Sequence, residues 1–305
     1  MDEQTGRVIQ STGKWYIVNL GDETIECRLP GKFRLDKRKV TNPVAVGDRV
    51  KIKVEEDKRG TITEILEREN YIPRQATRNR RGEQILVSNI DRAWAFQSIK
   101  QPKLNPGFID RFLVTCEAYE VPAGVVINKM DLANKNASRY ADEITEMYQS
   151  IGYPVAQTSI LDNTSIREFA AALKDQISVF IGPSGVGKSS LLNAIDPDLN
   201  LKVGEISSDS QKGKHTTTFA KLVPLKDGGY IVDTPGIREF GVVNIEKSEL
   251  SLYFPEMMEP RQNCKFYNCT HYHEPNCGVV EAYKDGLIAA ERYNSYLNIL
   301  ESLEI

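Results

Sequence analysis

The sequence predicts a multidomain protein in which an all-β barrel is followed by an α/β domain and then by a small α-helical unit. Three observations predict this fold class. The first 70 residues contain short β-type segments separated by glycines. From about residue 85, β-rich and helix-type segments alternate, and after residue 236 a cysteine cluster and a helical tail replace that pattern. We therefore expect domains over residues 1–70, 71–240 and 241–305.

Composition narrows the class of protein. With 305 residues, 40% hydrophobic and 27% charged, the chain is typical of a soluble globular protein. It has no run of about 18 apolar residues and no signal-peptide pattern, so we expect a cytoplasmic protein without membrane contact. Residues 1–100 carry 20 Lys or Arg against 15 Asp or Glu, and the remainder carries 19 against 27. A nucleic-acid surface would therefore lie in the N-terminal third, although a solvated charged surface explains the same numbers.

The N-terminal domain is predicted as five short strands rich in Val, Ile and Thr, a number typical of an OB-fold. The predicted strands are residues 6–10, 14–20, 23–29, 48–55 and 60–67. The loop 28–39 carries six basic residues and one acidic residue. Because OB-folds commonly bind oligonucleotides, we expect this loop to contact RNA phosphates; the alternative is an ordinary charged loop. The segment 73–84, which is rich in arginine and lacks apolar periodicity, predicts a linker or mobile basic loop.

The α/β domain is predicted as six strands with interposed helices, which form a mostly parallel, doubly wound sheet. The predicted strands are residues 92–98, 123–128, 153–159, 177–182, 219–225 and 229–234. Helices are predicted over 105–120, 138–150 and 165–175, and another follows residue 188. Asn105 has the position of a helix cap, with Pro106 at the first helical position.

A phosphate-binding loop follows the strand at 177–182. Residues 182–190 read GPSGVGKSS and match G-x-x-x-x-G-K-[ST] between a strand and a helix, the context that the motif requires. Glycines let backbone N–H groups face the phosphates, Lys188 neutralises the β- and γ-phosphates, and Ser189 offers a hydroxyl to Mg²⁺. The predicted phosphate-binding residues are Gly182, Pro183, Ser184, Gly185, Val186, Gly187, Lys188, Ser189 and Ser190.

Guanine is indicated by NKMD at 128–131, at the end of a predicted strand. The Asp131 carboxylate can accept hydrogen bonds from the N1–H and the amino group of guanine, donors that adenine does not present together. The tetrapeptide alone is a weak signal, because its parts are common in loops. The sequence TSI at 158–160 can supply a backbone N–H to the guanine carbonyl. The predicted base-binding residues are Asn128, Lys129, Met130, Asp131, Thr158 and Ser159.

Two further sequences complete a GTPase. In DTPG, Asp233 can reach the Mg²⁺ shell through water, and the N–H of Gly236 can contact the γ-phosphate. The polar loop 212–219, KGKHTTTF, can supply a Mg²⁺-binding threonine. Among Thr216, Thr217 and Thr218 we favour Thr217. We therefore expect GTP or GDP and Mg²⁺ as ligands.

The order of these motifs is unusual. Ordinary GTPases place the phosphate loop first and the base-reading motif last, whereas here the base-reading motif comes first and DTPG comes last. This order predicts a circular permutation that leaves the sheet intact. After Gly236 the chain runs directly into the cysteine-rich tail, so movement of the DTPG segment on hydrolysis is expected to act on the next domain.

The tail predicts a structural zinc site. Cys264, Cys269, His271 and Cys277 have the spacing C-x4-C-x-H-x5-C, and three thiolates with one imidazole make a closed tetrahedral Zn²⁺ site. His273 is an alternative to His271, and three buried thiols without metal are the alternative to the site itself. The isolated Cys27 and Cys116 are expected to be reduced core residues.

With these motifs the whole chain resembles the ribosome small-subunit-dependent GTPase A family. The sequences RAWAFQS, NKMD, GPSGVGKSS, GKHTTT and DTPG and the cysteine–histidine spacing carry the resemblance. It implies a permuted GTPase that assists late maturation of the bacterial 30S subunit and hydrolyses GTP with stimulation by that subunit. It also implies that the OB-fold and the zinc module contact 16S rRNA. We expect a monomer.

The catalytic group is predicted outside DTPG. Ile237 follows Gly236, where Ras-like proteins place a catalytic Gln. His215 is the only histidine outside the zinc module and can reach the attacking water, a role that the resemblance also implies; the alternative is a solvated loop histidine. Two other functions compete. A metabolic P-loop kinase or ATPase needs neither Asp131 nor zinc, and an RNA-binding scaffold with a vestigial nucleotide site would hydrolyse nothing.

Overall fold

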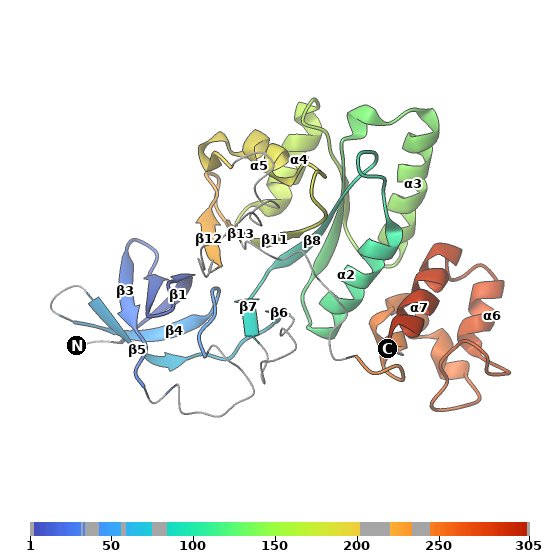
Figure 1. The fold of residues 1–305 in the computed structure, drawn as a ribbon, viewed down its shortest axis with the longest axis horizontal. Coiled ribbons are helices and arrows are strands. Elements are labelled where there is room, and N and C mark those ends of the chain that lie inside the picture. The colour runs from blue at the N-terminus through green and yellow to red at the C-terminus, as the bar shows by residue number, and fades with distance from the viewer. Residues whose placement is uncertain are drawn as a thin grey trace, which may run out of the picture.

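The computed structural model describes residues 3–31, 33, 43–55, 59–74, 84–201, 220–233 and 245–303. Three units are visible in Figure 1. The α/β unit lies in the middle, with the β-barrel on one side of it and the C-terminal helical unit on the other. Among the described helices, none combines the length and the apolar character needed to cross a membrane.

The N-terminal unit is a closed five-stranded barrel. Its strands are β1 (Glu3–Ser11), β2 (Trp15–Asn19), β3 (Thr24–Arg28), β4 (Arg49–Val54) and β5 (Arg59–Ile65). The pairing runs β1–β2–β3–β5–β4 and returns to β1, so the ring is closed and every strand has two neighbours. Val8, Val18 and Ile62 fill its interior and are 0% exposed. The predicted OB-type barrel is confirmed, although most of the basic loop 28–39 lies outside the described residues.

A β-hairpin joins the barrel to the α/β unit. Strands β6 (Tyr71–Arg74) and β7 (Gln84–Ser88) pair antiparallel, so the prediction of a linker over 73–84 is wrong at both ends of that segment. The buried side chains of Ile72 and Val87 explain the pairing, because they pack in the same apolar core as the α/β sheet. Residues 75–83 lie outside the described part of the chain.

The α/β sheet has the strand order β10-β9-β8-β11-β13-β12. Neighbouring strands are parallel except β12, which is antiparallel to β13. The strands are β8 (Arg92–Ser98), β9 (Ala123–Asn128), β10 (Val155–Gln157), β11 (Ile177–Ile181), β12 (Lys221–Pro224) and β13 (Tyr230–Asp233). All six predicted strands are therefore present.

Helices cover both faces of this sheet (Figure 1). They are α2 (Pro106–Ala118), α3 (Lys135–Ser150), α4 (Asn163–Leu173) and α5 (Lys188–Ile195). Alternate residues of β8 divide between two cores: Ala93 and Ala95 pack with α2 and α3, and Trp94 and Phe96 pack with α4 and α5. The predicted cap is confirmed, since the Asn105 side chain accepts from the Phe108 N–H at 3.2 Å. Helix α3 begins three residues earlier than predicted, where Asn134 caps it.

The C-terminal unit contains three short 3₁₀ helices, η3 (Leu250–Tyr253), η4 (Pro255–Met257) and η5 (Pro260–Asn263), followed by α6 (Gly278–Lys284) and α7 (Ala290–Ser302). The predicted helical tail is thus two helices, and Gly286, with φ +76°, lies between them. A separate apolar core holds the unit together and includes Phe254, Met257 and Tyr296. Val114 of α2 belongs to the same core, so the unit packs directly on the α/β domain.

Candidate functional site

Three sequence-predicted loops meet at one edge of the sheet. Residues 128–131 begin at the last residue of β9, residues 158–160 follow β10, and residues 182–187 follow β11. These strands are parallel, so their carboxyl ends lie at the same edge, where open α/β sheets bind ligands. The structure therefore brings together segments that are far apart in the sequence.

The phosphate loop has its conformation fixed by glycine. Gly185 and Gly187 have φ +82° and +94°, values that side-chain-bearing residues rarely adopt. A Cβ on Gly187 would lie 2.5 Å from Nδ2 of Asn128, and a Cβ on Gly182 would collide with the carbonyl oxygen of Phe96. The loop is thus tightly packed against β8 and against the predicted base-reading segment.

Lys188 lies inside this loop. Its ammonium donates to the carbonyl oxygens of Gly182 at 2.7 Å and Pro183 at 2.9 Å, and the residue is 6% exposed. Burial lowers the pKa of Lys188 from 10.5 to about 8. The next residue, Ser189, is 7% exposed and lies in the first turn of α5, beside the same loop. A buried cation at the N-terminus of a helix that follows a glycine-rich loop is suited to a phosphate chain.

Asn128 joins the base-reading segment to the phosphate loop. It is 1% exposed, its Nδ2 donates to the carbonyl oxygen of Val186 at 3.0 Å, and its Oδ1 accepts from Thr158 Oγ1 at 2.9 Å. Lys129 reaches the same loop, since its Nζ donates to the carbonyl oxygen of Gly185 at 2.5 Å. These contacts hold the two segments in fixed relative positions.

The Asp131 carboxylate has a defined orientation. Its Oδ1 accepts from Ser159 Oγ at 2.6 Å, and the Met130 N–H donates to the Thr158 carbonyl oxygen at 3.1 Å. Hydrogen bonds from the loop after β10 therefore position the carboxylate that is predicted to read guanine. This arrangement can accept two parallel N–H donors from a ligand.

One contributor was absent from the sequence prediction. The carbonyl oxygen of Gln101, in the loop after β8, accepts from Lys129 Nζ at 2.7 Å. Because β8 lies between β9 and β11, its carboxyl end is also at this edge of the sheet. The position of β8 in the sheet could have indicated that the loop after it lies at the site, but the loop has no sequence motif that identifies Gln101.

The remaining predicted residues are only partly described. Asp233 ends β13, which lies next to β11, so its backbone is at the same edge of the sheet. His215, Thr217 and Gly236 lie outside the described residues, as does Ile237.

Cys264, Cys269, His271 and Cys277 form a cluster in the C-terminal unit. Their candidate ligand atoms all lie within 4.8 Å of one another. The sulfur atoms of Cys264 and Cys277 are 3.8 Å apart, and His271 Nδ1 lies 3.5 and 3.3 Å from them. A tetrahedral ion with bonds of about 2.0–2.3 Å requires ligand separations of this size, so the cluster could hold a metal such as Zn²⁺.

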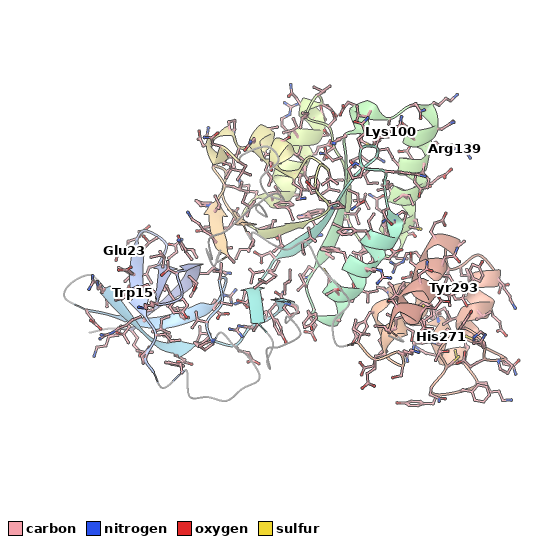
Figure 2. All side chains as sticks on the ribbon, in the orientation of Figure 1. Trp15, Glu23, Lys100, Arg139, His271 and Tyr293 are labelled. Atoms are coloured by element: carbon pink, nitrogen blue, oxygen red, sulfur yellow. The ribbon has the colours of Figure 1, made fainter. Side chains whose placement is uncertain are left out.

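Hydrogen bonds orient the loop of residues 270–274, which contains His271 and is here called the histidine loop. Tyr293 and Tyr296, from α7, donate to the carbonyl oxygens of His271 at 2.8 Å and Thr270 at 2.7 Å. Figure 2 shows His271 and Tyr293 next to each other in this unit. Although burial acts to raise the pKa of Glu274, hydrogen bonds from Thr270 and neighbouring backbone lower it to about 2. His273, the alternative ligand, is exposed and contacts the ring of Tyr272, with ring centroids 3.5 Å apart and ring planes tilted by 37°.

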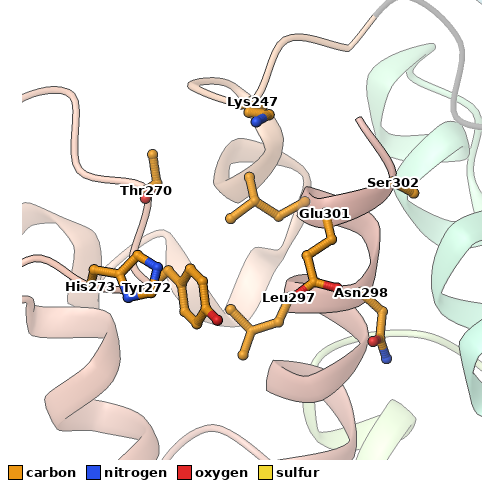
Figure 3. Close-up of a pocket in the computed structure, with 9 residues that line it drawn as sticks. Lys247, Thr270, Tyr272, His273, Leu297, Asn298, Glu301 and Ser302 are labelled. Atoms are coloured by element: carbon orange, nitrogen blue, oxygen red, sulfur yellow. The ribbon is translucent and has the colours of Figure 1, made fainter. Parts of the chain in front are cut away.

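A groove of about 710 Å³ lies between the histidine loop and α7 (Figure 3). It is lined by Lys247, Thr270, Tyr272, His273, Leu297, Asn298, Leu300, Glu301 and Ser302. None of these is a predicted nucleotide ligand or belongs to the cysteine–histidine cluster.

Comparison with known proteins gives consistent matches along the chain. Residues 65–243 match the RsgA GTPase family and residues 5–62 match the RsgA N-terminal domain. The chain is 45% identical to the small ribosomal subunit biogenesis GTPase RsgA of Phocaeicola vulgatus, over 98% of this chain and 97% of the relative. It is 44% identical to the protein of that name from Flavobacterium psychrophilum, over 97% and 92%.

Two crystal structures have the same fold. YjeQ from Thermotoga maritima matches with a TM-score of 0.81 and 36% identity, covering 99% of both chains. YloQ, described as a circularly permuted GTPase, matches with a TM-score of 0.79 and 33% identity, covering 99% of this chain and 96% of its own.

Proposed function

The chain belongs to the RsgA GTPase family, and on this premise we propose that it hydrolyses GTP to GDP and phosphate on the small ribosomal subunit, where it assists late 30S maturation. One observation carries the proposal: Asn128 bonds to both the phosphate loop and Thr158, so the base-reading and phosphate-binding residues form one site. The names of the relatives supply the small ribosomal subunit as the partner. We further propose 16S rRNA as the surface contacted, a monomeric state and a cytoplasmic location.

We assign the base-binding role to Asn128, Lys129, Met130, Asp131, Thr158 and Ser159. Asp131 accepts from the guanine N1–H and amino group, because Ser159 holds one of its oxygens in place. An adenine in the same position would leave the carboxylate without its two donors, which disfavours ATP. The site therefore favours a guanine nucleotide over the substrates of a metabolic kinase or ATPase.

The phosphate chain is assigned to residues 182–190. Backbone N–H groups of the loop face its oxygens, and Lys188 exchanges its carbonyl partners for the β- and γ-phosphates. Ser189, Thr217 and Asp233 would hold Mg²⁺, directly or through water, and Gly236 would contact the γ-phosphate. Bound there, Mg²⁺ neutralises charge on the β- and γ-phosphate oxygens.

His215 is proposed as the group that positions the attacking water, since Ile237 cannot replace a Gln. We expect slow hydrolysis by the free protein and faster hydrolysis on the 30S subunit. His215→Ala should bind GTP and the subunit normally and lose most of the stimulated turnover. Stimulation equal to that of the wild type would remove His215 from the mechanism.

Cys264, Cys269, His271 and Cys277 are proposed to hold one structural Zn²⁺. The spacing of their ligand atoms fits a closed tetrahedral site, which leaves no position for a catalytic water. The ion would join the histidine loop to the start of α6, where the Cys277 sulfur accepts from the Val280 N–H at 3.5 Å.

The deciding experiment for the function is GTP turnover by the purified chain with and without purified 30S subunits. Stimulation of GTP hydrolysis, with ATP hydrolysed poorly, supports the proposal. Equal use of ATP would favour a metabolic P-loop enzyme. No hydrolysis under either condition would favour an RNA-binding scaffold.

A further inference from the structure

The barrel is joined to β12 and β13, the strands next to the loop 212–219 and the DTPG sequence. We call these two segments the switch sequences, because GTPases reorder such segments around the γ-phosphate. Gln10 of β1 pairs with Lys221 of β12, and Lys221 pairs with Asp233 of β13. These three residues therefore lie in one line across three adjacent strands. Asp233 is the first residue of DTPG, and Lys221 follows the predicted switch loop 212–219 by two residues. The first strand of the barrel thus touches the hairpin whose two ends lead into both switch sequences.

Side chains reinforce this contact. A bulge between Val8 and Gln10 interrupts the pairing of β1 with β2. Val8 packs inside the barrel, whereas Ile9, at the bulge, packs against the core of the α/β domain. Tyr230, the first residue of β13, packs against that same core and accepts a hydrogen bond at 2.7 Å from Asn19 Nδ2 of the barrel.

The other attachment of the barrel is dense and buried. Asp48 is 0% exposed and accepts from Arg68 Nε and Nη2, both at 2.7 Å, and from Ser88 Oγ at 2.6 Å. Asn89 Nδ2 donates to the Gly47 carbonyl oxygen at 3.1 Å. These residues fix the barrel to the segment entering β8, which carries no switch sequence. Among the described residues, the contact of the barrel with β12 and β13 therefore has fewer buried hydrogen bonds than its contact with the segment entering β8.

We propose that Ile9 and Tyr230 are positioning residues that couple RNA binding by the barrel to GTP hydrolysis. This inference rests on the proposed function, because it takes the barrel as the RNA-binding unit. RNA bound to the barrel stabilises one position of β1, and β12 and β13 follow through the paired backbone and the packed side chains. RNA binding to the barrel therefore stabilises one position of the ends of β12 and β13, which adjoin the switch sequences.

The test compares variants at the contact by turnover at saturating GTP while 30S subunits are titrated. Ile9→Ala should lower the stimulated kcat about fivefold or more, and Tyr230→Phe should lower it by a smaller factor because only the hydroxyl is removed. The KM for GTP and the turnover without subunits should not change. In Ile9→Ala, the affinity for 30S subunits with a non-hydrolysable GTP analogue, divided by the affinity with GDP, should also be lower than in the wild type. Ile9→Val, which keeps most of the packing, should restore stimulation.

Ile65→Ala is the matched control, because Ile65 packs against the barrel core and not against the α/β core. Loss of stimulation in Ile9→Ala with stimulation retained in Ile65→Ala supports the proposal. Wild-type stimulation in both Ile9→Ala and Tyr230→Phe overturns it, as does an equal loss in Ile65→Ala, which would indicate general weakening of the barrel. A wild-type protein that 30S subunits do not stimulate would instead overturn the proposed function and the inference with it.

Discussion

At the scale of single residues, the proposed selectivity for guanine rests on the Asp131 carboxylate, which Ser159 already orients. Asp131→Asn replaces one acceptor with a donor that faces the guanine amino group. We expect GTP affinity to fall by about 100-fold, because an unpaired or opposed polar group costs about 1–3 kcal/mol, while affinity for xanthine nucleotides rises. Fluorescence titration with labelled nucleotides measures both. Asp162→Asn, which keeps the cap of α4, is the control; unchanged GTP binding by Asp131→Asn would refute the base-reading assignment.

Lys188 predicts a pH dependence of nucleotide binding. Without phosphate its pKa is about 8, because burial lowers it from 10.5. A phosphate next to the ammonium raises the pKa, so binding takes up a proton wherever the free side chain is neutral. As far as Lys188 contributes, GTP affinity should therefore be flat below about pH 8 and decrease above it. Calorimetry at pH 7 and pH 9, in two buffers with different protonation enthalpies, measures the proton uptake.

In the protein without nucleotide, Lys188 makes the free energy of unfolding rise with pH, whereas it makes GTP affinity fall. Between about pH 8 and pH 10.5 the unfolded chain binds more protons at Lys188 than the folded chain. The free energy of unfolding should therefore rise with pH in that window as far as this residue contributes. Lys188→Arg is the control for both measurements, because its side chain stays charged and any remaining pH dependence comes from other groups. If the wild type and Lys188→Arg take up the same number of protons when GTP binds at pH 9, the assignment of the proton uptake to Lys188 is wrong.

At the scale of elements, alternation and motif position were enough to predict the strands and the loops that bear the site. The six α/β strands were predicted because parallel buried strands read as short apolar runs. The hairpin β6–β7 was not, because its few apolar positions, Ile72 among them, flank an arginine-rich segment that resembles a linker. The Gln101 carbonyl could not be predicted either, because a backbone acceptor leaves no trace in residue type.

The proposed zinc ion predicts that the C-terminal elements depend on metal binding. Few regular hydrogen bonds hold residues 264–277, since the described elements there are short turns. Removing zinc, or the substitution Cys269→Ser, should unfold this unit and lower the metal content from about one ion per chain. GTP affinity should remain, because the nucleotide site lies in a separate core. Elemental analysis and nucleotide titration test the two halves of this prediction, and native protein lacking zinc would refute it.

At the scale of the whole molecule, permutation connects the switch sequence to a different unit and leaves the site unchanged. The sheet order keeps the base-reading and phosphate loops as near neighbours, so cutting the domain elsewhere leaves the ligand site whole. The sequence could predict this order, but it could not predict how the three units attach. The barrel contacts β12 and β13, whereas the C-terminal unit packs on α2, whose Val114 belongs to the core of that unit.

A buried ion cluster joins the C-terminal unit to the α/β domain. Arg292 of α7 is 1% exposed and contacts Asp110 of α2 at 2.6 Å and Glu256 of η4 at 2.6 Å. Asp110 also accepts from Tyr148 Oη at 2.7 Å. Burial acts to lower the pKa of Arg292, but the two carboxylates act more strongly and raise it above its ordinary value, so the guanidinium stays charged. Docking of the unit therefore depends on a cation held between two carboxylates.

Arg292→Met should loosen this docking. It leaves Asp110 and Glu256 buried without their cation, a change that typically costs about 3–5 kcal/mol. Hydrogen exchange should accelerate in α2 and α7, while zinc content and GTP affinity stay near wild type. Arg139→Met, which breaks an exposed pair with Glu143, should cost less than about 1 kcal/mol and is the control.

If the triple variant Arg292→Met, Asp110→Asn, Glu256→Gln is no more stable than Arg292→Met alone, unpaired charge is not the cause of the loss. If exchange in α2 is unchanged in Arg292→Met, apolar packing such as that of Val114 holds the two units together without the ion cluster.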